Sequence, residues 1–310
     1  MKAIQYNEYA GLGGMALAEI PIPSIAADEV LVRVIAAGVN PVDIAVSAGV
    51  LQQFLPLVLP VVAGSEIAGV IEQVGADVQD CAIGDAVHAA TGISGAFADY
   101  CAIKAANVVA KPVSLSFAEA AALPIAAATA TAALNATAVG VNTRIVIHAA
   151  SGGVGSVAVQ MAKARGAYVI ALASPANIDF VRSLGADEAV DRTSAYEDVI
   201  RDVDVVLDAY GPEAQARSWG LLRKGGILAS LVTQPSEEEA ARHGVQVQRI
   251  FGTPTAQVLV DADALVDKGQ LRLTIHNIYP LADAVAALQE VESGRVRGKV
   301  ILQISPDGEQ

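Results

Sequence analysis

The chain has 310 residues, of which 53% are hydrophobic and 17% are charged, and its formal net charge is −13. This length suggests two domains, and the composition can bury a large core, which excludes a disordered chain. The acidic balance, with no run of Lys and Arg, excludes a surface built to neutralise nucleic-acid phosphates.

Targeting and membrane signals are weak throughout the chain. The longest uncharged stretch, residues 120–143, consists mainly of Ala and Thr and contains Pro124, whereas a spanning helix needs Leu, Ile, Phe and Val. The start, MKAIQYNEYAGLGG, lacks the apolar core of a signal peptide. Cys81 and Cys101 are too few for a disulfide scaffold, although one bridge between them stays open. We therefore expect a cytoplasmic protein without a membrane partner.

The first third of the chain, to about residue 111, consists of short segments rich in Val and Ile. Examples are EVLVRVIAAGV, VVAGSEIAGVIEQVG and AIGDAVHAA, which begin at residues 29, 61 and 82. Gly and Asp separate them at turn positions, which predicts a compact β or barrel-like domain. The stretch Asn40-Pro41-Val42-Asp43 is typical of a helix start, with an N-cap, a Pro at N1 and an acid at N3.

The sequence pattern changes near Ser116, which has Glu119 three residues later as in a capping box. Strand and helix patterns then alternate, which predicts βαβ units on a parallel sheet covered by helices on both faces. The predicted strands are 144–150, 167–173, 202–211 and 227–232, and the predicted helices are 116–136, 156–166, 177–186 and 213–226. A further strand-like segment, GVQVQRIFG at 244–252, would be an aggregation-prone sheet edge if left open.

A glycine-rich stretch, HAASGGVGSVAVQ at 148–160, joins the first of these strands to its helix. It fits the pattern A-x-x-G-x-x-G from Ala149 through Gly152 to Gly155. Glycines at such a place make a sharp turn, let a pyrophosphate approach the backbone and let the helix pack on the strand. The helix N-terminus also attracts anions. Ser151, Gly152 and Gly153 are therefore candidate cofactor residues, and a structural turn without a ligand is the alternative.

The end of the next strand bears on which dinucleotide is bound. An NAD-binding fold usually places an acid there, but the strand ends in ASPAN and no acid occurs before Asp179. Ser174 and Asn177 can instead donate hydrogen bonds to a 2′-phosphate, with Arg182 or Arg192 supplying charge. The alternative is that Ser174 and Asn177 only cap the following helix. We predict NADPH as the cofactor.

Taken together, these segments resemble the medium-chain dehydrogenase/reductase superfamily, within it the zinc-free quinone oxidoreductase branch. The resemblance rests on AAGVNPVDIAVSAG, LPVVAGSEIAGVIEQVGADVQDCAIGDAVHA, LPIAAATATAAL, HAASGGVGSVAVQMAKARGAYVIA, SLGADEAVD, DVVLDAYG and GRVRGKVIL. It implies an α/β chain with two domains. A GroES-like β-barrel substrate domain takes 1–122 and 265–310, and a Rossmann domain with a doubly wound parallel sheet takes 123–264 and binds NADP.

The resemblance also implies an activity and a set of site residues. The activity is zinc-independent, NADPH-dependent hydride transfer to small apolar electrophiles, namely quinones or α,β-unsaturated carbonyl compounds. Asn40 is expected beside the nicotinamide ribose and the substrate, as the one catalytic residue. The other residues carried over surround the pyrophosphate and nicotinamide or close over the cofactor: Thr129, Gly153, Val154, Phe251, Arg297 and Lys299. The segment 244–252 is expected to pair with its twin in a homodimer.

Several departures from the family pattern affect these expectations. Zinc-dependent relatives place a Cys and a His where this chain has Asn40 and Ser65, so no metal is expected. Ala45 and Ser47 stand where related reductases often carry Tyr and Arg. Arg192 stands where relatives commonly have a Tyr beside the adenine; it can stack on the base, pair with phosphate or simply lie at the surface.

Two other functions stay open at this point. The chain could be a non-catalytic NADPH-binding redox sensor or structural protein on the same fold, since fold alone does not establish activity. An enoyl-thioester reductase is the other alternative, but it needs a cationic groove for its carrier, which this acidic chain lacks.

Overall fold

The computed structural model describes residues 1–306, which pack into two compact units. Unit 1 contains residues 1–125, 254–263 and 273–306, and unit 2 contains residues 126–253 and 264–272. The division expected from the sequence, 1–122 with 265–310 against 123–264, differs in where it places residues 123–125, 254–263 and 265–272. Two helices cross the unit boundaries in the chain, α3 (Pro124–Ala136) and α8 (Ala256–Asp267).

Unit 1 is built around a seven-stranded, mainly antiparallel sheet and a smaller three-stranded sheet, of orders β15-β16-β3-β5-β6-β8, with β7 on β3, and β2-β1-β4. Apolar residues such as Ile4, Ile67 and Phe97 fill its core. Its elements are β1 (Lys2–Tyr6), β2 (Ala16–Glu19), β3 (Glu29–Val39), α1 (Pro41–Ser47), β4 (Val61–Val62), β5 (Glu66–Val74), β6 (Ala86–Ala90), β7 (Tyr100–Lys104), β8 (Val109–Ala110), α2 (Phe117–Ala121), β15 (Ile275–Pro280), α9 (Ala284–Glu292) and β16 (Lys299–Gln303).

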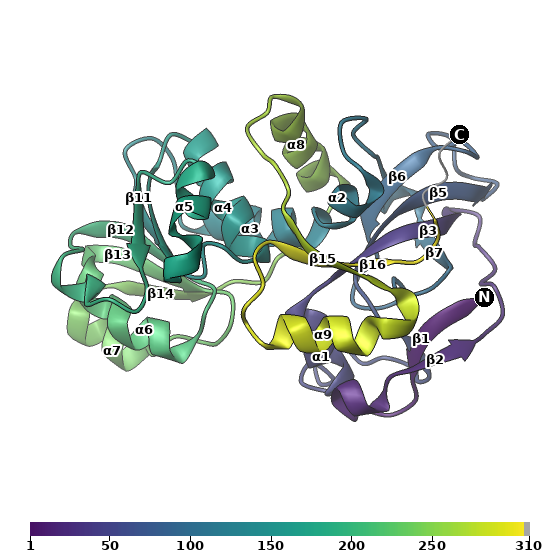
Figure 1. Ribbon diagram of the computed structural model, residues 1–310, viewed down its shortest axis with the longest axis horizontal. Helices are drawn as coiled ribbons and strands as arrows, with labels where there is room; N and C mark the ends of the chain where they lie inside the picture. Colours follow the sequence, from purple (N-terminus) through teal and green to yellow (C-terminus); the bar gives the residue numbers. More distant parts are fainter. Residues whose placement is uncertain (307–310) are drawn as a thin grey trace. The chain divides into compact units, whose positions relative to one another are not determined.

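Unit 2 is a doubly wound sheet of six parallel strands in the order β11-β10-β9-β12-β13-β14. Helices α4 and α5 cover one face and α6 and α7 the other (Figure 1). The predicted fold class is confirmed. The elements are β9 (Arg144–Ile147), α4 (Gly153–Ala164), β10 (Tyr168–Ala173), α5 (Ile178–Ser183), β11 (Glu188–Asp191), β12 (Val203–Asp208), α6 (Pro212–Ser218), β13 (Leu222–Ser230), α7 (Glu237–His243) and β14 (Gln246–Arg249).

The predicted helix start at Ser116, which depends only on residues close in sequence, is confirmed. Ser116 accepts a hydrogen bond from the backbone N–H of Glu119, whose carboxylate accepts from the backbone N–H of Ser116, and α2 begins at the next residue. Pro124 separates α2 from α3, so the single helix predicted over 116–136 is in fact two. Within the described residues no helix has the length and hydropathy that a bilayer requires, and Cys81 and Cys101 are free.

The helix predicted over 213–226 is wrong in its second half. Helix α6 ends at Ser218, and Leu222 already pairs with Val203 of β12 as the first residue of β13. Gly225, at φ 74°, lies inside this irregular start of the strand, where the register shifts. Pairing with the neighbouring parallel strand therefore overrides the local helix propensity of this segment.

Candidate functional site

The glycine-rich turn of unit 2 lies between β9 and α4, at the carboxyl end of the parallel sheet. This is where the strand order reverses, between β9 and β12, which is the usual ligand-binding place in such sheets. Helix α4 begins at Gly153, so the N–H groups of Gly153 and Val154 lie in its first turn and have no acceptor within the helix. A helix N-terminus of this kind attracts anions.

Close packing, rather than turn geometry, explains why Gly155 must be a glycine. A Cβ at Gly155 would lie 2.2 Å from the carbonyl oxygen of Ala149, which is too close for any side chain. The sharp turn was predicted to need a glycine, but the residue with positive φ is Ala149, at 49°. An alanine held in the left-handed region stores strain, as is common beside ligand sites. The amide of Gly152 donates to the Ala149 carbonyl at 2.9 Å and closes the turn.

Three predicted cofactor residues form one polar cluster. The side-chain amide of Asn177 donates to the hydroxyls of Ser151 and Ser174, both at 3.1 Å, so it uses both of its hydrogens on them. Within residues 1–306 neither hydroxyl hydrogen has an acceptor of its own. The cluster therefore presents two O–H donors at the ends of β9 and β10, the chemistry that a phosphate requires.

Arg192 lies beside this cluster, because its backbone N–H donates to the carbonyl of Ala173 at 2.9 Å, one residue before Ser174. Its guanidinium donates to the Tyr210 hydroxyl at 2.9 Å and lies 5.0 Å from the centre of that ring. No carboxylate pairs with Arg192 in the described part of the chain. The positively charged Arg192 side chain, held against the Tyr210 ring, thus lies close to Ser151 and Ser174.

Arg192 and Tyr210 also line a small pocket. The other residues that line it are His148, Ala149, Tyr196, Glu213, Ala214 and Arg217. His148 is buried, and burial lowers its pKa to about 4, so the ring is neutral at pH 7. Its Nε2 is 2.9 Å from the hydroxyl of Ser218, which itself donates to the carbonyl of Ala214. Nε2 must therefore carry the proton. His148 is therefore a core residue with a satisfied hydrogen bond.

Thr129 and Phe251 belong to unit 2 as well. Gly252 packs so tightly on Thr129 that a Cβ there would lie 2.8 Å from the Thr129 hydroxyl. Phe251 is 69% exposed, and the guanidinium of Arg249 lies 4.8 Å from its ring centre. Both residues remain cofactor candidates by resemblance.

Unit 1 carries the second candidate site, a buried polar cluster around Asn40. The Asn40 side-chain amide donates to the carboxylate of Glu66 at 2.7 Å, and its oxygen accepts from the ammonium of Lys299 at 2.5 Å. The predicted cap geometry of α1 is present with Pro41 at N1, and Asp43 accepts from the backbone N–H of Asn40 at 2.8 Å. The charged partners of the Asn40 side chain are Glu66 and Lys299.

Two predicted cofactor residues of unit 1 differ in their exposure to solvent. Arg297 is exposed and Lys299 is buried, although only one glycine separates them in the chain. Sequence reasoning missed Glu66, Asp43 and Tyr210 as site residues. A charged residue inside the apolar run VVAGSEIAGVI was the signal that could have found Glu66.

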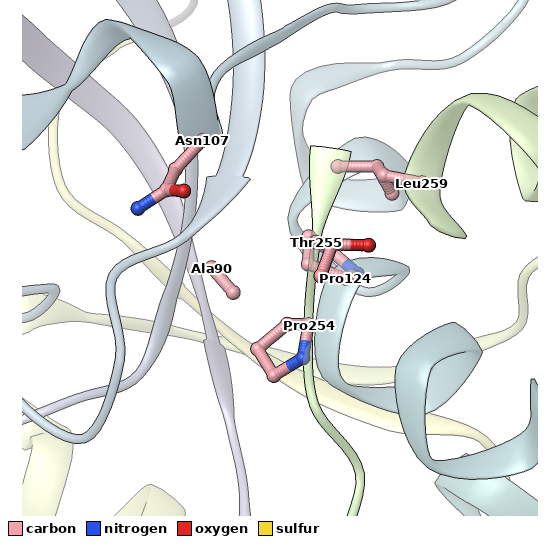
Figure 2. Close-up of a pocket in the computed structure, with 6 residues that line it drawn as sticks. All are labelled: Ala90, Asn107, Pro124, Pro254, Thr255 and Leu259. Carbon is pink, nitrogen blue, oxygen red and sulfur yellow. The ribbon is translucent and has the colours of Figure 1, made fainter. Parts of the chain in front are cut away.

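A further pocket, in unit 1, has few reactive side chains in its lining. Figure 2 shows Asn107 on one side of it and Thr255, Pro254 and Leu259 on the other. Ala90 and Pro124 complete the lining, which contains no charged or nucleophilic side chain other than the Thr255 hydroxyl. We do not assign it a catalytic role.

The doubly wound sheet with its glycine turn, joined to a largely antiparallel unit, defines the class of two-domain dehydrogenases and reductases. Residues 26–113 match the family described as the alcohol dehydrogenase GroES-like domain, and residues 184–302 match the family described as zinc-binding dehydrogenase.

Relatives extend this similarity over nearly the whole chain. The chain is 31% identical to the chloroplast envelope quinone oxidoreductase homolog of Arabidopsis thaliana, over 98% of each chain. It is 32% identical to the chloroplastic NADPH-dependent alkenal/one oxidoreductase of the same plant, over 99% of this chain and 80% of that one. The solved quinone oxidoreductase of Coxiella burnetii is 30% identical, with a TM-score of 0.89 over 98% and 99% of the two chains.

The chain therefore belongs to the medium-chain dehydrogenase/reductase superfamily, in the branch of the quinone oxidoreductases. It is an oxidoreductase of the nicotinamide-dependent type.

Proposed function

We propose that this protein is an NADPH-dependent, zinc-independent reductase of small quinones and α,β-unsaturated carbonyl compounds, with unit 2 as its cofactor domain and unit 1 as its substrate domain. The observation that carries the cofactor assignment is the cluster of Ser151, Ser174 and Asn177 with Arg192 beside it. Two O–H donors and a guanidinium suit the 2′-phosphate of NADPH, whereas the ribose diol of NADH would favour a carboxylate.

The zinc-independent part of the proposal is supported by the donor set around Asn40. The positions that hold zinc in metal-dependent relatives carry an amide and a hydroxyl, Asn40 and Ser65, and neither is a usual zinc ligand. The neighbouring carboxylate, Glu66, is already bonded to the Lys299 ammonium at 2.7 Å. A metal ion would have to displace that ammonium. Zinc thus does not fit this site, although one matching family is described as zinc-binding.

NADPH, when bound, supplies the hydride. The chain's own contribution is to bind and orient the cofactor and to stabilise the negative charge that develops on the substrate carbonyl oxygen. Asn40 has no pKa suited to acid–base work, but its N–H can donate to that oxygen or to a ribose hydroxyl. Quinones and enones suit such a site because their reduction gives a delocalised anion, which needs less stabilisation than the alkoxide of a simple ketone.

The test is NADPH oxidation with 1,4-benzoquinone and a small enone, compared with NADP reduction by a simple alcohol. We expect the first two to react, and Asn40→Ala to lower kcat/KM by roughly 10- to 1,000-fold without unfolding the protein. Asn7→Ala, at an exposed position, is the matched control and should keep the wild-type rate.

Three outcomes would count against the proposal. Reaction with the alcohol alone would contradict the reductase assignment. NADPH binding without any turnover would favour the non-catalytic alternative. One tightly held zinc per chain after dialysis, found by elemental analysis, would contradict the metal-free site.

A further inference from the structure

Lys299 is a buried lysine whose charge is entirely used within the chain. It begins β16, and its ammonium donates to the Asn40 side-chain oxygen at 2.5 Å, to Glu66 at 2.7 Å and to the carbonyl of Val39 at 3.3 Å. An ammonium has three donors, and each has an acceptor here. Lys299 therefore has no N–H left for a substrate or a cofactor, and any influence it has on a reaction passes through its neighbours.

Glu66 lies at the centre of the same cluster, in a space shaped to hold it. It is fully buried, and its Oε1 accepts from both Lys299 and Asn40, while Oε2 accepts from the backbone N–H of Ile125 at 2.8 Å. Gly38 leaves room for the carboxylate, since a Cβ there would lie 2.2 Å from Oε1. The carboxylate is thus held by donors from three parts of unit 1.

The two charges together determine which way the Asn40 amide points. Its oxygen faces the ammonium and its nitrogen faces the carboxylate, so a half-turn of the amide would lose both charge-assisted hydrogen bonds. The second hydrogen of the nitrogen has only long contacts, 3.4 Å to Ser65 and 3.5 Å to the carbonyl of Gly38. The amide is therefore locked at both ends, with one weakly engaged N–H remaining for a ligand.

We propose that Lys299 and Glu66 are positioning residues that lock the Asn40 side chain and keep its second N–H directed to the reacting ligand. The expected effect on the reaction rate rests on the proposed function. The hydrogen bonds that hold the Asn40 side chain lie within unit 1 and do not depend on it. Neither residue is catalytic, because Lys299 has no free donor for the ligand and Glu66 is fully buried.

The kinetic test removes both charges together, since removing one would leave the other buried and unpaired. In Lys299→Met/Glu66→Gln, the glutamine can still accept from Ile125, but the amide of Asn40 loses its two charged partners. We expect kcat to fall about 10- to 100-fold, while the KM for NADPH stays within about two-fold and the melting temperature stays near that of the wild type.

Lys163→Met/Asp187→Asn is the matched control, because it removes a lysine–carboxylate pair with the same 2.7 Å separation in unit 2. That variant should keep the wild-type kcat. If the Lys299/Glu66 double variant also keeps the wild-type kcat, the positioning role is refuted.

A second measurement needs no turnover. With ¹⁵N-asparagine labelling, the side-chain NH₂ signals of Asn40, identified by their loss in Asn40→Ser, should be protected from solvent exchange in the wild type. In the double variant we expect their exchange to be at least about ten-fold faster, since the bond to the carboxylate is gone. Equal exchange in the two proteins would overturn the proposal. If the wild-type protein oxidises no NADPH but the variant still exchanges faster, the positioning of Asn40 is upheld and only the proposed function is refuted.

Discussion

Asp43 offers the sharpest test of the polar cluster in unit 1, through the pH dependence of stability. Its carboxyl is buried, one oxygen accepts from the backbone N–H of Asn40 at 2.8 Å, and the other has no partner within residues 1–306. Burial raises its pKa from 3.8 to about 7, with Glu66 adding to the rise, against the opposing effects of the bond from Asn40, the nearby Ser65 side chain and the charge of Lys299. We predict that Asp43→Asn removes a large pH-dependent destabilisation.

The direction and size of this pH dependence follow from the pKa of Asp43 in the folded and the unfolded protein. An unfolded chain releases this proton near pH 4, whereas the folded protein keeps it to about pH 7. Between these values the native state binds more protons, so the free energy of unfolding falls as the pH rises. A rise of about three units corresponds to about 4 kcal/mol, since each unit is about 1.4 kcal/mol. This contribution is fully present below pH 4 and lost by about pH 8.

The assay is urea unfolding followed by circular dichroism at pH 4.5, 6 and 8. An asparagine can accept the same bond from Asn40 without a charge, so the variant should gain up to about 4 kcal/mol over the wild type between pH 4.5 and 8. Asp80→Asn, at an exposed position, is the control and should show no such gain. A difference between variant and wild type that stays constant with pH, within about 0.5 kcal/mol, would refute the argument.

Three further predictions concern packing, cofactor choice and assembly. Gly38→Ala should cost at least about 1–3 kcal/mol in urea unfolding, because its Cβ would meet Glu66 at 2.2 Å and Ala121 at 2.5 Å, whereas Gly140→Ala, with open space around it, should be nearly neutral. Ser174→Asp should shift calorimetric affinity from NADPH towards NADH by repelling the 2′-phosphate; an unchanged preference would contradict our phosphate site. Light scattering should give twice 31.6 kDa, since β14 is an open sheet edge, and a monomer at micromolar concentration would refute pairing.

Much of this protein could be predicted from the sequence because the deciding interactions are local. The capping box of Ser116 and Glu119 acts over three residues, and the alternation of strand and helix patterns is a property of short segments. The glycine turn before α4 was likewise visible, because its flanking strand and helix are adjacent in the chain.

The tertiary structure decided what depends on distant partners. Leu222 joins a strand rather than a helix because Val203 of β12 is there to pair with it. Asn40 has the sequence of a helix cap, yet its side chain is claimed by Lys299, 259 residues away, and by Glu66. Charged groups excluded from water interact more strongly than a local cap in contact with solvent, and only folding brings them together. The sequence therefore determined the fold class and the glycine-rich turn, while the orientation of the Asn40 amide exists only once β3, β5 and β16 have assembled.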